Sequence, residues 1–230
     1  MLTVRNLVTG YGGAPVLHGI DLHLARGEVL GLLGRNGAGK STFVKAIMGL
    51  LPHASGHVEF RGEPLLGLPT HRVARAGIGI VPQGRWIFPG LTVAENLGTG
   101  TRAAGLAADD VPEAVFRYFP VLKQRLKQRG GTLSGGEQQM LAIGRALCGR
   151  PKVLLLDEPS DGVQPNIVQR LGELIPALCS ELEISAIVVE QNLDLVLAAT
   201  HRCLVIENGR VVHEGHPDAD IHTLERLLAV

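Results

Sequence analysis

The run Gly34-Arg35-Asn36-Gly37-Ala38-Gly39-Lys40-Ser41 is the strongest signal in this sequence, because it has the pattern Gly, four residues, then Gly-Lys-Ser. The segment Glu28–Leu33 before it predicts a β-strand, and Lys40–Leu50 after it predicts a helix with one apolar face. Glycines let backbone N–H groups turn toward a phosphate, and a helix N-terminus favours an anion. This context predicts a phosphate-binding loop rather than an ordinary Gly-rich turn.

Two further motifs supply candidate catalytic groups. Within the loop, we expect Lys40 to neutralise the β- and γ-phosphates of a nucleotide and the Ser41 hydroxyl to bind Mg²⁺. The apolar run 153–156, which predicts a strand buried on both faces of a parallel sheet, ends in Asp157-Glu158. Asp157 is placed to hold Mg²⁺ and Glu158 to orient or deprotonate the attacking water. Strands often end in acidic residues, so this interpretation depends on the phosphate loop.

The run Leu133-Ser134-Gly135-Gly136-Glu137-Gln138-Gln139 has two explanations. Ser134 and Glu137 fit a capping box at the start of a helix that continues through the run 140–147. The capping box does not explain the double glycine, which exposes backbone N–H groups to an incoming anion.

Taken together, these motifs resemble the ATP-binding subunits of ABC transporters, and the resemblance covers essentially the whole chain. It implies that Tyr11 stacks on adenine, and that Gln83 reaches Mg²⁺ and senses the membrane subunits. A simple turn or core aromatic remains the alternative for Tyr11. The implied nucleotide-binding residues are Tyr11, Gly34, Asn36, Gly37, Gly39, Lys40, Ser41, Thr42, Ser134, Gly135 and Gly136. The implied catalytic residues are Glu158, Lys40 and Gln191, and the implied metal ligands are Ser41, Gln83 and Asp157.

The expected fold is α/β: a P-loop NTPase core with an antiparallel β subdomain and an inserted helical subdomain, as in ABC ATPases. Residues 84–146 lose β character and read as helices broken by prolines. We therefore expect one ABC ATPase domain over 1–230, in which 1–83 and 147–230 form the core with the β subdomain. Residues 84–146 form the helical subdomain with the Ser134 motif.

Two positions depart from the family pattern. Gln191 stands where the family often has a His that contacts the γ-phosphate, and Gln164 replaces the usual closing Asp of the loop after Glu158. The segments 81–89 and 189–192 resemble one importer subfamily, which handles branched-chain amino acids and, in a close branch, urea and short amides. The run 162–165 leans toward the urea branch. The effect of the two glutamines on hydrolysis rate and coupling between sites stays open.

Composition limits the possible partners. Among 230 residues, Lys+Arg and Asp+Glu balance at 22 each, so the basic excess of a nucleic-acid binder is missing. No stretch approaches the roughly 18 apolar residues of a spanning helix, and the start lacks a signal-peptide pattern. The scattered Cys148, Cys179 and Cys203 are expected to be buried thiols. We expect a peripheral protein on the cytoplasmic face of the inner membrane.

The resemblance implies three kinds of partner. A second ATPase subunit, either a copy of this chain or a sister chain, pairs head to tail so that ATP lies between one phosphate loop and the other chain's Ser134 motif. Permease subunits span the membrane, and an extracytoplasmic solute-binding protein acts indirectly. The consecutive apolar residues Trp86, Ile87 and Phe88 are expected at the permease contact, the alternative being that all three pack inside the helical subdomain.

The leading hypothesis is therefore a Mg²⁺-dependent ATPase coupled to import of a small polar or amino-acid-like solute, with ATP and Mg²⁺ as cofactors. An ABC protein of translation or DNA repair is a second class, but those usually carry two fused ATPase domains or a long coiled-coil insertion. A nucleotide-gated binding module with little hydrolysis is a third class. Gln191 permits it, and Glu158 argues against it.

Overall fold

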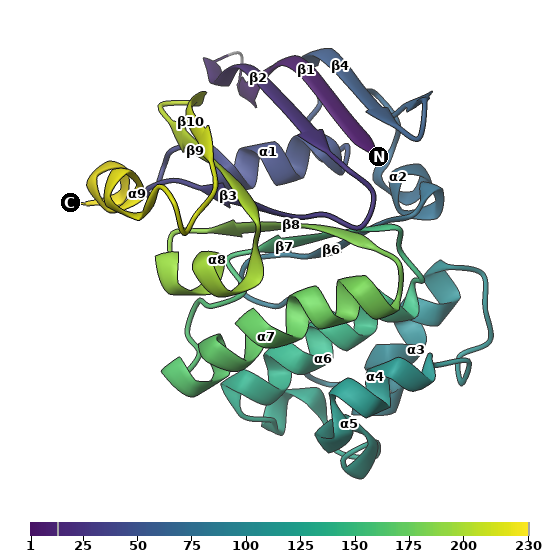
Figure 1. Cartoon of the computed structure of the whole chain (residues 1–230). Helices are drawn as coiled ribbons and strands as arrows, with labels where there is room; N and C mark the ends of the chain where they lie inside the picture. Colours follow the sequence, from purple (N-terminus) through teal and green to yellow (C-terminus); the bar gives the residue numbers. More distant parts are fainter. Residues whose placement is uncertain (13, 230) are drawn as a thin grey trace.

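The computed structural model describes residues 1–12 and 14–229, which form two β-sheets with helices between and beside them (Figure 1). The larger sheet has six strands in the order β10-β9-β3-β8-β7-β6, and all neighbours except β10 and β9 run parallel. Its strands are β3 (Val29–Leu33), β6 (Ile78–Val81), β7 (Val153–Asp157), β8 (Ser185–Glu190), β9 (Arg202–Glu207) and β10 (Arg210–Gly215).

The smaller sheet is antiparallel, with the order β2-β1-β4-β5. Helix α1 (Lys40–Ile47) lies between the two sheets (Figure 1), where Phe43 and Ile47 are buried in a core shared by both. The strands of this sheet are β1 (Leu2–Tyr11), β2 (Ala14–Leu24), β4 (Ala54–Phe60) and β5 (Glu63–Pro64).

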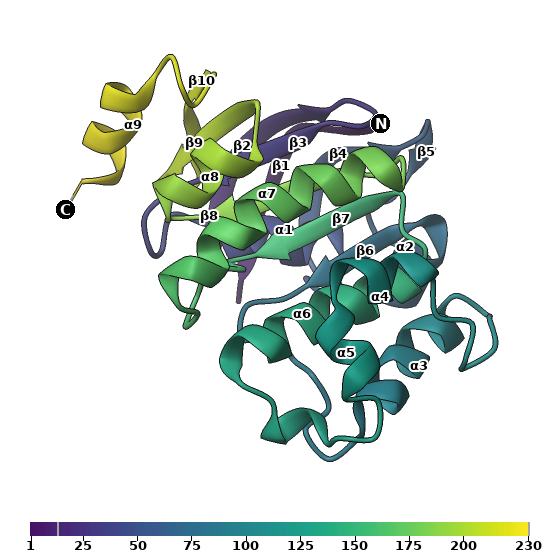
Figure 2. The same ribbon diagram turned by 60° about the horizontal axis from the view of Figure 1, so that its bottom comes forward.

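The other helices follow two patterns of packing. Figure 1 places α6, α7 and α8 on the face of the large sheet opposite α1, and Figure 2 shows α3 to α6 gathered to one side. Among the described residues every helix is too short or too polar to cross a membrane. The helices are α2 (Thr70–Ala76), α3 (Val93–Ala103), α4 (Glu113–Tyr118), α5 (Pro120–Gln124), α6 (Gly135–Cys148), α7 (Pro165–Glu181), α8 (Leu193–Ala199) and α9 (Ile221–Leu228), with a 3₁₀ turn at Gly130–Thr132.

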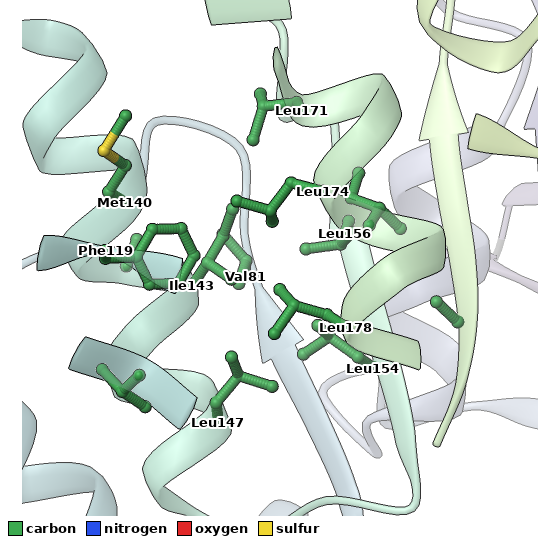
Figure 3. Close-up of a cluster of buried hydrophobic side chains, with 14 of the residues drawn as sticks. Val81, Phe119, Met140, Ile143, Leu147, Leu154, Leu156, Leu171, Leu174 and Leu178 are labelled. Carbon is green, nitrogen blue, oxygen red and sulfur yellow. The ribbon is translucent and has the colours of Figure 1, made fainter. Parts of the chain in front are cut away.

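A second hydrophobic core fixes the helices on the sheet (Figure 3). Leucines of α7 meet those of β7, while residues of α6 and Phe119 complete the cluster. Helices α3 and α6 approach closely at Gly100, where a Cβ atom would lie 2.1 Å from the carbonyl oxygen of Arg145. Glycine is therefore required at this crossing, where it lets α3 pack directly against α6.

Local sequence signals explain where most elements begin and end. Strands β3, β7 and β8 are completely buried, as expected for parallel strands covered on both faces. Thr92 with Glu95 caps α3, and Ser134 with Glu137 caps α6, each forming both bonds of a capping box. The α/β fold class predicted from the sequence is confirmed. The division at residues 84 and 146 stays a prediction, since α6 runs on to Cys148 and packs against both α3 and β6.

Candidate functional site

The loop between β3 and α1 takes a conformation that its glycines make possible. Gly37 and Gly39 have φ angles of 81° and 111°, which side-chain-bearing residues rarely adopt. At Gly39 a Cβ atom would also lie 2.7 Å from Leu17 Cδ2. The first turn of α1 follows directly, so its unpaired N–H groups face the loop. The loop and the start of the helix together present these N–H groups to one place, and the binding of an anion there stays a prediction.

Lys40 is the centre of a buried polar cluster. Its side chain is 4% exposed, and Nζ donates to the carbonyl oxygens of Gly34 at 2.8 Å and Arg35 at 3.2 Å. Nζ also lies 3.2 Å from Oε1 of Glu158, while Gln83 Nε2 donates to Oε2 of the same carboxylate at 2.8 Å. The residues predicted to act on phosphate, water and metal are thus brought within one cluster from three distant segments.

Glu158 is held in an unusual backbone conformation. Its φ angle is 49°, in the left-handed region, and its N–H donates to the carbonyl oxygen of Val189 on β8 at 2.8 Å. Its carbonyl oxygen accepts from the N–H of Asp161 at 3.1 Å, closing a turn. Strained backbone of this kind gathers at functional sites, because the surrounding structure over-determines it.

The oxygen ligands expected for Mg²⁺ lie beside this cluster. Ser41 Oγ donates to Asp157 Oδ1 at 3.2 Å. Burial raises the pKa of Asp157 to about 6 and the charge of Glu158 acts in the same direction, whereas the bond from Ser41 opposes the shift. A hydroxyl and a carboxylate at this distance fit a Mg²⁺ ion, which prefers few protein oxygens and completes its octahedron with phosphate oxygens and waters. Burial disfavours the charged form of Asp157, and a bound cation would stabilise that charged form.

Lys40, Ser41 and Glu158 line a cavity of ≈ 290 Å³. The cavity contains most of the nucleotide-binding residues implied by the sequence, together with Gln83 and Glu158. Its lining consists of Val16, Asn36, Gly37, Gly39, Lys40, Ser41, Thr42, Gln83 and Glu158.

Tyr11, at the end of β1, is 48% exposed and so is not a core aromatic. Lys45 Nζ lies 5.7 Å from the ring centroid and 3.4 Å from the phenol oxygen. The exposed position makes the ring available to a flat ligand, and its stacking on adenine stays a prediction.

The Ser134 motif lies outside the cavity at Lys40. Ser134 is exposed at the start of α6, where its N–H donates to Oε2 of Glu137 at 2.8 Å. A Cβ atom on Gly136 would lie 3.1 Å from Ile167 Cγ1, and one on Gly135 would lie 3.3 Å from Arg85 Nη1. The double glycine therefore also permits close packing. One chain carries the phosphate loop and the Ser134 motif at separate places.

Gln191 is exposed at the end of β8 and lines a cavity of ≈ 360 Å³ with Arg35, Asn36 and Leu228. It thus lies beside the phosphate loop, as the sequence implied for the position that often holds His. The approach of α9 to this place, through Leu228, was not expected from the sequence.

Two residues that the sequence analysis missed hold the loop after Glu158. The fully buried Glu190 accepts from the N–H of Ser160 through Oε1 at 2.8 Å, and from those of Gln191 and Asn192 through Oε2 at 3.1 and 3.2 Å. Burial raises the pKa of Glu190, and these three bonds oppose the shift. The sequence signal that could have identified Glu190 is its position at the end of an apolar run. Glu190 is the last residue of β8, just as Asp157 is the last residue of β7. Arg85 is the second residue, and its guanidinium group donates to the carbonyl oxygens of Asp161 and Gly162 in the same loop.

The fold and the cluster around Lys40 define an ATPase of the phosphate-loop class. The model of the family described as "ABC transporter" matches residues 17–161, more than half of the chain, and the chain belongs to this family as an ATP-binding subunit.

Relatives with more specific descriptions match over nearly the whole chain. The high-affinity branched-chain amino acid transport ATP-binding protein BraG of Pseudomonas aeruginosa is 45% identical, over 92% of this chain and 91% of that protein. The probable branched-chain amino acid transport ATP-binding protein LivF of Archaeoglobus fulgidus is 34% identical, over 94% and 92%. The crystal structure of a nucleotide-free ATP-binding cassette from an ABC transporter superposes with a TM-score of 0.86 at 25% identity, over 100% of this chain and 97% of that chain.

Proposed function

We propose that the chain hydrolyses Mg²⁺-ATP to drive import of branched-chain amino acids, as a peripheral subunit on the cytoplasmic face of the inner membrane. The proposed solute rests on the 45% identity to BraG over nearly the full length of both chains. Urea or a short amide is the alternative solute, favoured by the run 162–165.

The cluster at Lys40 supports the following course of hydrolysis. ATP phosphates enter the cradle of N–H groups and take the place of the Glu158 carboxylate beside Lys40 Nζ. The freed carboxylate of Glu158 accepts a proton from water while the water oxygen bonds to the γ-phosphorus. The bond from that phosphorus to the bridging oxygen of ADP breaks, giving ADP and phosphate. Mg²⁺, held by Ser41, Asp157 and Gln83, would neutralise charge on the phosphates.

The separation of the Ser134 motif from the Lys40 cavity supports a head-to-tail dimer. A surface-exposed helix N-terminus with two glycines suits an anion, and a second ATPase subunit, a copy or a sister chain, would present its own such terminus to the ATP bound at Lys40. Two shared sites would then close with ATP and open after hydrolysis, a shift of population driven by differential affinity for nucleotide.

An apolar groove supports docking of a permease. A cavity of ≈ 450 Å³ lies between β6 and helices α2, α3 and α6, and Trp86 and Phe88 form part of its wall. Trp86 is 72% exposed and Phe88 49%, whereas Ile87 packs against the core. The alternative in which all three residues pack inside the helical segment is therefore wrong for Trp86 and Phe88. Exposed aromatic residues beside a groove are typical anchors for a partner.

Replacement of Trp86 by Ala tests the docking proposal. We expect basal ATP hydrolysis to stay near the wild-type rate, while pull-down of the co-expressed permease and solute uptake both fall. Leu50→Ala is the matched control, since Leu50 is 53% exposed and does not line the groove. Normal pull-down and uptake combined with a loss of thermal stability would show that Trp86 serves the fold instead.

The solute is tested in cells whose only copy of this chain carries Glu158→Gln. We expect uptake of labelled leucine, isoleucine and valine to fall to the level of a deletion strain, with labelled urea unaffected. Loss of urea uptake alone would assign the chain to the urea branch. Normal uptake of both would refute the importer proposal. An extracytoplasmic solute-binding protein would select the solute, and nucleic acid is not an expected partner.

A further inference from the structure

The segment that leads from Gln83 to the apolar groove has a strained backbone. Gly84, Arg85 and Trp86 have φ angles of 77°, 70° and 46°, so three consecutive residues lie in the left-handed region. For Arg85 and Trp86 this conformation is intrinsically unfavourable, because their Cβ atoms crowd the backbone. The N–H of Arg85 donates to the carbonyl oxygen of Pro82 at 3.0 Å. Tertiary contacts must hold the segment in place.

The Arg85 side chain provides these contacts on the side of the catalytic loop. Its Nη2 donates to the carbonyl oxygen of Gly162 at 2.9 Å and to that of Asp161 at 3.2 Å. Its Nη1 lies 3.4 Å from Oε1 of Gln138 in the first turns of α6. The guanidinium group therefore joins the loop after Glu158 to the helix that begins at the Ser134 motif.

The Arg85 backbone is joined to the groove. Arg145, which lines the groove, donates from Nη2 to the carbonyl oxygen of Arg85 at 3.3 Å. The Arg145 guanidinium lies 5.3 Å from the ring centroid of Phe88, and burial lowers its pKa. Trp86, the neighbour of Arg85, forms another part of the groove wall. A partner that occupies the groove must contact residues bonded or adjacent to Arg85.

The loop held by Arg85 also carries the proposed base. The N–H of Asp161 donates to the carbonyl oxygen of Glu158, so residues 158 to 161 form one closed turn. A shift of Asp161 and Gly162 is therefore passed to the backbone of Glu158. The rigid planar fork of arginine suits this task, because one group can hold two neighbouring carbonyls at once.

We propose that Arg85 is a positioning residue that couples occupancy of the groove to the placement of Glu158. This inference rests on the proposed docking of a permease in the groove. Gln83 contacts the side chain of Glu158 directly, whereas Arg85 is a second connection that acts on the backbone of the turn 158–161. Through Gln138, Arg85 also links occupancy of the groove to the start of α6.

The test compares Arg85→Gln, Arg85→Lys and wild type in the complex with the co-expressed permease. For Arg85→Gln we expect normal assembly and an unchanged KM for ATP, while the permease-stimulated kcat falls by at least about fivefold, the lower end of coupling between sites. Arg85→Lys should be intermediate, since one ammonium group cannot reproduce the fork. Arg102→Gln is the matched control, because Arg102 is an exposed arginine on α3.

Hydrogen exchange separates coupling from a general structural role. In the wild type, assembly with the permease should slow exchange of the amides in residues 158–163, and in Arg85→Gln this change should be lost. Wild-type stimulation in Arg85→Gln, or a raised KM with unchanged kcat, would overturn the proposal, as would loss of assembly in that variant. If the wild-type chain does not assemble with the permease, the docking proposal fails and this coupling fails with it. Assembly without an effect of Arg85→Gln refutes the coupling alone.

Discussion

Replacing Glu158 by Gln separates its proposed catalytic role from its role in the nucleotide-free cluster. The change keeps the shape of the side chain but removes the charge that lies 3.2 Å from Lys40 Nζ. It also removes the proposed base. Loss of a general base typically lowers kcat by about 10²- to 10⁴-fold, and we expect hydrolysis in the variant to fall by that factor.

The buried ion pair gives a second, independent magnitude. Removing one partner of a buried pair typically costs about 3–5 kcal/mol. Here Lys40 keeps two carbonyl acceptors, Gly34 and Arg35, and the glutamine carbonyl can still accept one bond. We therefore expect a loss of about 1.5–3 kcal/mol, the range for a hydrogen bond to a charged group. For a chain of this size that loss lowers the Tm of the nucleotide-free protein by about 3–12 °C.

Nucleotide should reverse this loss, because the ATP phosphates replace the missing carboxylate beside Lys40. At 100 times Kd, ATP stabilises a protein by about 2.7 kcal/mol, and without a competing carboxylate the variant should bind at least as tightly as the wild type. Lys40→Ala should instead weaken binding itself. The assays are phosphate release, titration with a fluorescent ATP analogue, and thermal unfolding with and without Mg²⁺-ATP.

A matched control is Glu173→Gln, which removes the charge of an exposed carboxylate on α7. It should change neither turnover nor Tm by a measurable amount. Wild-type hydrolysis in Glu158→Gln would refute the assignment of the base. An unchanged Tm of the nucleotide-free variant would refute the stabilising role of the Lys40–Glu158 pair, whatever the turnover.

Three further predictions use other parts of the chain. Ser134→Arg should leave ATP binding at its own phosphate loop intact but block ATP-driven dimerisation in light scattering, measured with a sister chain where one exists; unchanged dimerisation would contradict the shared site. Burial raises the pKa of Cys148 and Cys179 to about 12 and that of Cys203 to about 11. Iodoacetamide at pH 8 should therefore label these thiols only after the protein has been unfolded, and rapid labelling of the native protein would contradict this prediction. Because burial also raises the pKa of Glu190, the stability it contributes is present below its unfolded pKa and lost as pH rises through its folded pKa. The Tm of wild type minus that of Glu190→Gln should accordingly fall as the pH rises above 4.5, the ordinary pKa of a glutamate, and a constant difference would be the opposing outcome.

Features that depend only on neighbouring residues could be predicted from the amino-acid sequence. The glycines at 37 and 39 permit positive φ angles, Lys40 begins a helix, and Ser134 with Glu137 forms a capping box. Each of these features depends only on residues a few positions apart. The apolar run that ends at Asp157 is a fully buried strand, as its local hydrophobic pattern predicted. Backbone preference and hydrophobic pattern are local properties, so these predictions needed no tertiary information. Lys40, Ser41, Asp157 and Glu158 were predicted from local motifs. Tyr11, Gln83 and Gln191 came from the resemblance to a family.

Contacts between residues distant in the sequence could not be predicted in this way, because they depend on how the elements pack. Ser41 and Asp157 are 116 positions apart, yet their side chains hydrogen-bond, and Lys40 finds its carboxylate at Glu158 because β3, β8 and β7 lie side by side. The sequence offered no pattern that joins Arg85 to Gly162, since that contact depends on how the helical segment packs on the sheet. The same packing turns Ile87 into the core and leaves Trp86 outside. Hydrophobicity could not separate these neighbours, because burial depends on which surface each side chain meets after the chain has closed on itself.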